Sequence, residues 1–286
     1  MTLIADGGST KCDWVLLDNT GKIIFKTRTQ GLNPAIVPPE ELDHRIGSNP
    51  ELQSVFETAQ QVDFYGAGCG TQTPRKILHE VIAQRFVNAQ VNVQEDTVAA
   101  VHAVTHEPGI VCIFGTGSNS VYFDGKKISN NAESLGYILM DEASGNYFGK
   151  RLICDYFYKK MPSNLAKNFE KNFDLNPDNI KINLYKKPNP NAYLASFAEF
   201  IFKTEDENGY FYNLIREGVL KFIDTRILLY QESQSVPIHF IGSIAFFSKE
   251  IIEECLHQHQ LKLGKIIRRP IDGLIEYYKK HKLNQG

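Results

Sequence analysis

The stretch Asp6-Gly7-Gly8-Ser9-Thr10-Lys11 lies between two short apolar runs, Leu3–Ala5 and Trp14–Leu17. This setting predicts a strand, a tight turn and a second strand, because adjacent glycines let the backbone turn sharply and approach a ligand closely. The turn offers backbone amides and two hydroxyls, and Asp6 leaves a carboxylate at the end of the first strand. Such groups together suit a phosphate with its magnesium ion. An ordinary β-hairpin with a Gly-Gly turn explains the stretch equally well on its own.

A second stretch, Gly115-Thr116-Gly117-Ser118-Asn119-Ser120, has the same setting. It follows the apolar run Ile110–Phe114, and Asp124-Gly125 then predicts a hairpin. Three strands are expected in the first segment, over about Thr2–Ala5, Cys12–Asp18 and Lys22–Arg28. This order of strands recurs from about residue 109, although no sequence identity is long enough to define a repeat. A nucleotide's phosphates can be held between two such turns, so the second stretch favours the phosphate interpretation.

Composition limits the classes of protein that the chain can represent. Its 286 residues, 42% apolar and 22% charged, can form one large domain or two moderate ones with an ordinary soluble composition. The net charge of −2 does not favour nucleic acid or an anionic membrane as a partner. The N-terminus lacks the basic and apolar regions of a signal peptide, and no apolar run reaches membrane-spanning length. A cytoplasmic location is therefore expected.

The cysteines are five, an odd number, and no pair has Cys-x-x-Cys spacing. The pattern predicts buried, reduced thiols in a cytosolic protein, and a metal or cluster site is the minor interpretation. They are Cys12, Cys69, Cys112, Cys154 and Cys255.

Three further polar positions each allow two interpretations. Asp96 lies where a strand ends and an alanine-rich helix begins, so it is either an N-cap or a general base at the carboxyl end of a strand. Asn33, before Pro34, is either a turn former or an amide that binds a polar ligand. Gly242-Ser243 ends the apolar run Pro237–Ile241, and it either starts the next helix or lies against a nucleotide.

Several expectations concern the rest of the chain. The acidic pair Asp141-Glu142 precedes a predicted helix and is compatible with its capping. Helices are expected over Glu51–Gln60 and Tyr210–Tyr230. The stretch from about 160 to 191 is rich in Asn, Lys and Pro, and is expected to be a surface excursion without chemistry.

The order and spacing of these stretches, over nearly the whole chain, resemble the actin/hexokinase superfamily. Residues 6–11 look like the first phosphate motif of that superfamily, and residues 115–120 look like its second phosphate motif. Asp96 looks like part of its first connecting motif, and residues 242–244 look like its adenosine motif. Within the superfamily, the chain most resembles the N-acetylglucosamine kinases and the BadF/BadG/BcrA/BcrD-type ATPase group that contains them.

One segment narrows the resemblance to the kinases. Gly136, followed by Asp141-Glu142 and Ser144-Gly145, is similar to a sugar-contacting segment of the N-acetylglucosamine kinases. It departs from that family at Leu135, where the family has an aromatic residue, and at Ala143, where it has glycine. These departures concern the choice of sugar more than the type of reaction.

The resemblance implies an α/β fold of two ribonuclease-H-like (actin-like ATPase) domains that face a central cleft. The first would span residues 1–112, with residues 273–286 completing it, and the second residues 113–272. The implied activity is ATP-dependent phosphorylation of an N-acetylated amino sugar, such as N-acetylglucosamine or N-acetylmuramic acid. ATP and Mg²⁺ are the implied cofactors, the sugar is the implied partner, and a homodimer is the default expectation for assembly.

The resemblance also implies a role for individual residues. Asp6 would hold Mg²⁺ through water, and Asp96 would be the base that takes the proton from the attacking hydroxyl. The sugar would lie against Asn33, Gly136, Asp141, Ser118, Asn119 and Asp96. The nucleotide would lie against Asp6, Gly8, Ser9, Thr10, Lys11, Thr116, Gly117, Gly242 and Ser243.

Two alternatives share the fold. The first is an ATP-driven activator of a 2-hydroxyacyl-CoA dehydratase, which carries an iron–sulfur cluster on closely placed cysteines; Cys112 and Cys154 form no matching motif. The second is a non-catalytic sugar or nucleotide sensor, against which the presence of Asp96 argues.

Overall fold

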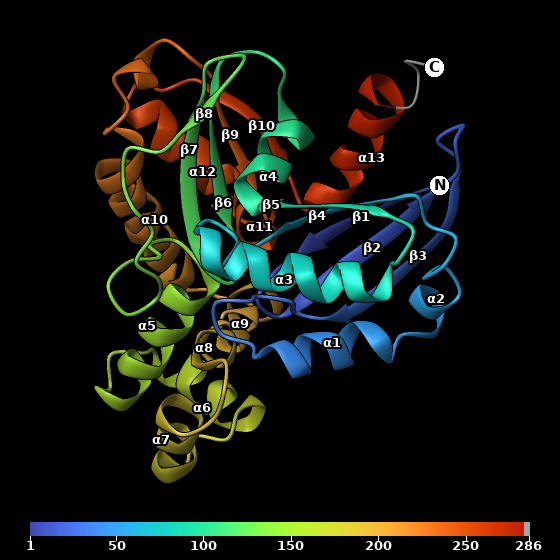
Figure 1. The fold of residues 1–286 in the computed structure, drawn as a ribbon. Helices are drawn as coiled ribbons and strands as arrows, with labels where there is room; N and C mark the ends of the chain where they lie inside the picture. Colours follow the sequence, from blue (N-terminus) through green and yellow to red (C-terminus); the bar gives the residue numbers. More distant parts are fainter. Residues whose placement is uncertain (283–286) are drawn as a thin grey trace. The chain divides into compact units, whose positions relative to one another are not determined.

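The computed structural model describes residues 1–282 and divides the chain into two compact units. Unit 1 holds Met1–His106 with the chain from Arg269 onwards, and unit 2 holds Glu107–Arg268. Each unit is built on a five-stranded mixed sheet with helices packed on it (Figure 1). The predicted α/β class is confirmed.

The sheet of unit 1 has the strand order β3-β2-β1-β4-β5. β1 pairs antiparallel with β2 and parallel with β4, β2 pairs antiparallel with β3, and β4 pairs parallel with β5. The turn 7–11 thus joins two antiparallel neighbours, as the flanking apolar runs predicted. The strands are β1 (Thr2–Gly7), β2 (Lys11–Leu17), β3 (Ile23–Gln30), β4 (Gln61–Gly66) and β5 (Gln90–Glu95).

Helices cover both faces of this sheet. Successive residues of its strands point to opposite sides, and apolar side chains on each side need to be buried. Leu3 and Trp14 belong to the core that includes α1 (Pro39–Gly47) and α3 (Gln72–Arg85). Ile4 and Val15 belong to the opposite core, with α4 (Asp96–Val104) and α13 (Pro270–His281). The predicted helix over 51–60 is wrong beyond its first turn, since α2 spans only Pro50–Gln53 and turns follow it.

The sheet of unit 2 repeats this topology. Its order is β10-β9-β6-β7-β8, and β6 pairs antiparallel with β7 and parallel with β9, as β1 does with β2 and β4. The predicted recurrence of the three-strand order from about residue 109 is therefore confirmed. The strands are β6 (Gly109–Phe114), β7 (Ser118–Phe123), β8 (Ile128–Ser129), β9 (Ile238–Ile241) and β10 (Leu263–Ile267).

An aromatic-rich core joins this sheet to the helices of unit 2. Phe114 of β6 contacts Phe222 and Phe240, with ring centroids 4.6 and 5.3 Å away. Such aromatic pairs stabilise a core beyond the apolar area that they bury. The helices are α5 (Gly145–Phe157), α6 (Ser163–Asn172), α7 (Pro177–Tyr185), α8 (Pro190–Phe197), α9 (Glu199–Lys203), α10 (Tyr210–Phe222), α11 (Ser243–Phe247) and α12 (Lys249–Gln258).

Two sequence predictions in unit 2 need correction. The Asn-rich stretch 160–191 is largely helical: it holds α6 and α7, and the Asn176 side chain accepts the N–H groups of Asp178 and Asn179. Asparagine is a favoured N-cap, so an Asn-rich stretch can start helices. The expected single helix Tyr210–Tyr230 changes character at Ile223–Ile227, which form a π-helix.

A buried polar network holds α13 to β4 in unit 1. The Tyr278 hydroxyl donates to Asp63 Oδ2 at 2.7 Å and lies 2.8 Å from the Tyr65 hydroxyl. Gln61 and Asn92 also donate to the Asp63 carboxylate, at 2.6 and 2.8 Å. This buried carboxylate is therefore well provided with donors, and α13 supplies one of them.

We expect Tyr278→Phe to lower the free energy of unfolding by about 1–3 kcal/mol, because it leaves buried polar atoms short of partners. Urea unfolding of the full chain measures this change. Tyr277→Phe is the matched control on the same helix; its ring stacks on His102 at 4.2 Å, and the substitution keeps the ring. The control should change stability by less than about 0.5 kcal/mol. Equal losses in the two variants would contradict the role given to the network.

Candidate active site

The turn after β1 is closed by hydrogen bonds and tightly supported. Gly8 N–H donates to the Lys11 carbonyl at 2.8 Å, and Gly31 N–H donates to the Thr10 carbonyl at 3.0 Å. A Cβ on Gly7 would meet the Phe64 ring, and a Cβ on Gly31 would meet the Ser9 carbonyl. Neither Gly7 nor Gly8 has a positive φ. Space for neighbouring groups, and not an unusual backbone bend, is therefore what requires glycine at position 7.

Asn33 lies against this turn. Its Nδ2 donates to Ser9 Oγ at 3.0 Å, and its Oδ1 accepts the Ala35 N–H at 2.9 Å. Gly68, with φ +79°, packs on the same Oδ1, where a Cβ would have no room. Asn33 is thus a turn former that also contacts a predicted phosphate-binding residue, and the structure brings these two sequence candidates together.

Carboxylates gather at the same end of the sheet. Asp6 of β1 faces Asp13 of β2 in the strand register. Burial, followed by repulsion from Asp13 and Asp96, raises the pKa of Asp6 to about 7. The positive charge of Lys11 and the Ile271 N–H of α13 act in the opposite direction. Sequence reasoning missed Asp13; hairpin pairing across the first turn was the signal that could have found it.

Asp96 is the first residue of α4, half-buried, directly after β5. The N-cap position belongs to Glu95, which makes no side-chain cap bond, so the capping interpretation of Asp96 is wrong in position. The Asp96 carboxylate still accepts the Thr97 N–H, while burial and the nearby Glu95 raise its pKa to about 7. A carboxyl group that titrates near neutral pH suits general-base chemistry.

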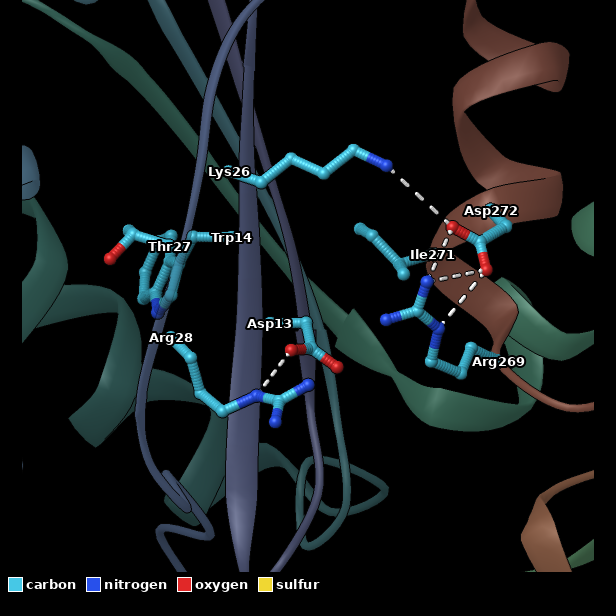
Figure 2. A pocket seen from close by; sticks show the side chains of 8 residues that line it. All are labelled: Asp13, Trp14, Lys26, Thr27, Arg28, Arg269, Ile271 and Asp272. Carbon is cyan, nitrogen blue, oxygen red and sulfur yellow. Dashed lines mark hydrogen bonds and ion pairs between the residues drawn. The ribbon is translucent and has the colours of Figure 1, made fainter.

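Ion pairs secure the edge of the sheet next to these carboxylates. Figure 2 shows a pocket of about 220 Å³ between strands β2 and β3 and the start of α13. Arg28 Nε donates to Asp13 at 2.6 Å, Arg269 pairs with Asp272 at 3.0 Å, and Lys26 Nζ lies 3.8 Å from Asp272. These partly exposed pairs contribute little each to stability. The pair Lys26–Asp272 joins β3 to the start of α13, whose Ile271 N–H reaches Asp6.

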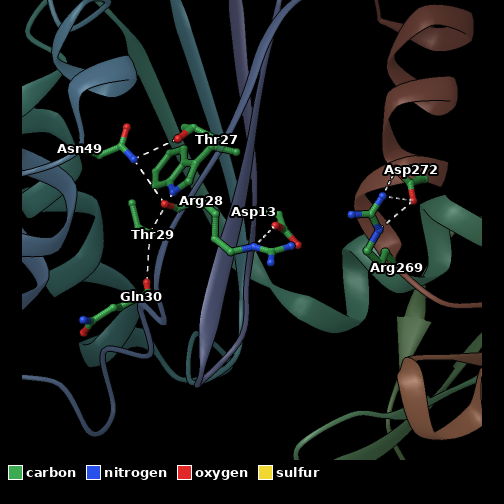
Figure 3. Close-up of polar contacts among 9 residues, drawn as sticks. Asp13, Thr27, Arg28, Thr29, Gln30, Asn49, Arg269 and Asp272 are labelled. Atoms are coloured by element: carbon green, nitrogen blue, oxygen red, sulfur yellow. Dashed lines mark hydrogen bonds and ion pairs between the residues drawn. The ribbon is translucent and has the colours of Figure 1, made fainter.

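Hydrogen bonds between uncharged groups also hold strand β3 in place. Figure 3 shows Asn49 donating to Thr27 Oγ1 at 3.0 Å and to the Arg28 carbonyl at 3.3 Å. The indole N–H of Trp14 donates to Thr29 Oγ1 at 3.1 Å. The strand that carries Arg28 is thus fixed both to β2 and to the segment that precedes α2.

The second turn, in unit 2, is held by the start of α5. Gly145 N–H donates to the Gly115 carbonyl and Asn146 N–H donates to the Thr116 carbonyl, both at 2.9 Å. The cap of α5 is Ser144, whose Oγ accepts the Tyr147 N–H at 3.3 Å. The acidic pair 141–142 therefore does not cap this helix, contrary to the sequence expectation, because the helix begins only at Gly145.

Asp141 supports the second turn from within unit 2. It is buried and has φ +73°. Its carboxylate accepts the Ser118 N–H at 3.2 Å and the Asn146 side-chain amide at 2.7 Å. A Cβ on Gly117 would lie 2.8 Å from Asp141 Oδ2. Burial raises the pKa of Asp141. The Ser118 hydroxyl is buried too, and has no hydrogen-bond partner within residues 1–282.

The remaining candidates of unit 2 differ in their surroundings. Gly242 has φ +121°, and a Cβ there would meet the Phe114 carbonyl and lie 3.2 Å from Gly115 N. The predicted adenosine turn therefore touches the start of the second phosphate turn. Ser243 is exposed at the start of α11, Asn119 Oδ1 accepts the Ser120 N–H, and Gly136 has φ +79° in an open loop.

The donor set at Asp6 fits a magnesium ion. Over residues 1–282, no three His, Cys, Asp or Glu side chains converge as a complete metal site. Magnesium prefers oxygen ligands and is commonly held by one or two carboxylates together with water and substrate phosphates. Asp6, with two further carboxylates near it, meets that requirement. All five cysteines are unpaired; four of them are buried, as predicted, whereas Cys154 is only half-buried. No helix within the described residues could span a membrane.

Solved structures resemble this chain over its whole length. A provisionally assigned N-acetylglucosamine kinase from Porphyromonas gingivalis has 35% identity and a TM-score of 0.90, covering 98% of this chain and 99% of its own. Another from Chromobacterium violaceum has 16% identity and a TM-score of 0.73, covering 96% and 98%. A ROK-family glucokinase from Streptomyces griseus, solved with glucose and AMPPNP, has 14% identity and a TM-score of 0.61, covering 100% and 99%. No protein-family model and no curated sequence matches.

The duplicated sheet topology and these likenesses define the class as an actin-like ATPase fold of the sugar-kinase type. The 35% identity with the Porphyromonas gingivalis protein is measured over an alignment that covers nearly all of both chains. The chain belongs to the N-acetylglucosamine kinase family. The other two likenesses concern the fold alone.

Proposed function

We propose that the protein transfers the γ-phosphoryl group of ATP to a hydroxyl of an N-acetylated amino sugar. The observation that carries this proposal is the carboxyl group of Asp96, which begins α4 at the carboxyl end of β5 with a pKa near 7. Open α/β sheets bind their ligands at that end of the strands. Membership of the N-acetylglucosamine kinase family supports the choice of substrate.

Phosphoryl transfer asks a protein mainly to position its substrates, to neutralise charge and to orient the nucleophile. We assign phosphate contacts to the two turns, through Gly8–Lys11 and Thr116–Gly117, and nucleoside contacts to Gly242-Ser243. Asp6 would hold magnesium through water, and the ion would neutralise charge on the phosphates. Asp96 accepts the proton of the attacking hydroxyl.

The sugar contacts follow from the polar groups beside these turns. Asn33 lies on the first turn, and Asp141 and Ser118 lie at the second. A site built from amides and carboxylates that bond to hydroxyls rejects ligands that lack them. Asn119 and Gly136 complete the proposed set of sugar contacts.

ADP release with ATP and Mg²⁺ tests this function against a panel of sugars. The panel is N-acetylglucosamine, N-acetylmuramic acid, N-acetylmannosamine, glucosamine and glucose. We expect turnover with an N-acetylated sugar, and much lower turnover with glucosamine and glucose. Folded protein that binds ATP but turns over no sugar would contradict the proposal and favour a sensor.

Ser118→Ala should change the affinity for the sugar without lowering the stability of the unliganded protein. The Ser118 hydroxyl is buried without a partner, so its removal should leave the unliganded free energy of unfolding unchanged or raise it by up to about 1 kcal/mol. We expect the sugar Kd to rise, because the hydroxyl then has no replacement at the ligand. Thermal unfolding with and without sugar measures both effects. A lower stability of the unliganded variant, with unchanged sugar affinity, would contradict the assignment.

A further inference from the structure

A buried arginine on the π-helix of unit 2 contacts the loop before Asp141. Arg226 is only 3% exposed. Its Nη1 donates to the Ala132 carbonyl at 3.0 Å, and its Nη2 donates to Met140 Sδ at 3.2 Å. One guanidinium group thus holds both ends of the loop 132–140. Within residues 1–282 it forms no ion pair, an unusual condition for a buried cation.

The loop has few other attachments of its own. Tyr137 is half-buried and packs against the core of unit 2, but Leu135, Ile138 and Leu139 are 59%, 73% and 68% exposed and anchor the loop poorly. Inside the loop, Met140 N–H donates to the Gly136 carbonyl at 2.9 Å and Leu135 N–H donates to Met140 Sδ at 3.4 Å. A segment with so little buried apolar surface opens easily unless a specific contact holds it.

The segment that carries Arg226 is itself firmly attached to the sheet. Leu228 N–H donates to the Ile223 carbonyl at 2.9 Å, closing the wide π turn. The Tyr230 hydroxyl donates to the Ser120 carbonyl of β7 at 2.8 Å. The positive charge of Arg226 partly offsets the rise in the pKa of Asp141 that burial causes. The segment 223–230 is thus connected both to β7 and to the loop that precedes Asp141.

We propose that Arg226 is a positioning residue for the sugar: it holds the loop 132–140, and with it Gly136 and Asp141, in the conformation that binds substrate. This inference rests on the proposed function. On this proposal, the π-helix serves to present Arg226 to the loop. Single π-helical turns within helices are frequent at functional sites. Arginine is required because its planar fork reaches two acceptors at once, which a lysine ammonium on a flexible stem does not reproduce.

The test compares Arg226→Lys with the wild type in steady-state kinetics and amide hydrogen exchange of the full chain. We expect the KM for the sugar to rise about tenfold, with kcat and the KM for ATP changed less than about twofold, since the loss falls on ground-state binding. Amides of residues 134–141 should exchange about tenfold faster without ligand. Met140→Leu, which keeps volume and removes the sulfur acceptor, should shift both readouts in the same direction and serves if Arg226→Lys does not fold.

Arg216→Lys on α10 is the matched control, since Arg216 is half-buried and donates to Gln258 at 2.8 Å, a residue outside the loop 132–140. It should leave both readouts unchanged. Unchanged exchange in residues 134–141 of Arg226→Lys or Met140→Leu would overturn the inference, as would faster exchange with an unchanged sugar KM. Absence of sugar turnover in the wild type would instead overturn the proposed function, and the exchange readout would still decide whether Arg226 holds the loop.

Discussion

Asp96→Asn is expected to lower kcat by about 10²- to 10⁴-fold, the range that a positioned general base contributes. The amide is nearly isosteric with the carboxyl group but cannot accept the proton of the attacking hydroxyl. Coupled ADP release, with the sugar that the wild type uses best, measures the loss. The variant should keep its ATP affinity, because we assign the phosphate contacts to the two turns and not to Asp96.

The stability of Asp96→Asn shows whether its loss of activity comes from unfolding. A variant that is at least as stable as the wild type at the pH of the assay has lost activity for another reason. Burial raises the folded-state pKa of Asp96 to about 7, above its ordinary value of 3.8. Its contribution to stability is therefore fully present below pH 4 and is lost as pH rises through 7. Asp96→Asn lacks this ionisation and should be more stable than the wild type at pH 8, but not at pH 4. Lower stability at pH 8 would contradict this account.

Glu95→Gln is the control for the neighbouring carboxylate. Activity that needs ionised Asp96 should rise with pH through about 7 in kcat/KM. Because Glu95 helps to raise the pKa of Asp96, its neutralisation should move the midpoint of this rise to lower pH. The plateau at high pH should remain close to that of the wild type. A plateau as low as that of Asp96→Asn would mean that the wrong carboxylate has been assigned as the base.

Asp6→Asn is expected to lower kcat/KM by about 10²- to 10³-fold, since a magnesium ion contributes several kcal/mol of charge stabilisation to phosphoryl transfer. It should also weaken the binding of Mn²⁺ in the presence of ADP, which electron paramagnetic resonance measures without turnover. Because Asp6 would hold the ion through water, the substitution removes the negative charge that attracts the hydrated cation, and a neutral amide does not replace it.

Asp13→Asn is the matched control for Asp6, because Asp13 faces Asp6 across the hairpin but already accepts from Arg28 at 2.6 Å. It should bind Mn²⁺ nearly as well as the wild type. Its activity should extend to lower pH, since Asp13 is one of the groups that raise the pKa of Asp6. Equal loss of Mn²⁺ in both variants would contradict the assignment of the metal to Asp6.

Local patterns in the sequence predicted much of the fold. The two turns at 6–11 and 115–120 lie between paired antiparallel strands because apolar runs flank each of them. The duplicated topology could be predicted from the order of the strands, although no sequence identity between the two halves is long enough to define a repeat. The helices of 160–191 were missed because polar asparagines there act as caps, as Asn176 does, and an Asn-rich stretch alone reads as a loop.

The site was less predictable, because its geometry depends on tertiary contacts. The Asn33 side chain donates to Ser9 and packs against Gly68, and both of these residues lie in loops that are distant from it in sequence. Arg226 was missed although a signal was present: it lies with Ile223, Ile227 and Tyr230 on the buried stripe of a helical segment. A cation at a core position of an amphipathic pattern needs a polar partner, and only the structure supplies that partner.

The phosphorus-31 NMR spectrum of a reaction that holds the wild-type protein, ATP, Mg²⁺ and N-acetylglucosamine tests the central claim most directly. We expect a new phosphomonoester resonance coupled to a sugar proton, growing as the γ-phosphate of ATP declines, and growing at least about 10²-fold more slowly with Asp96→Asn. A spectrum in which ATP yields only inorganic phosphate, with this sugar and with the other N-acetylated sugars of the panel, would contradict it.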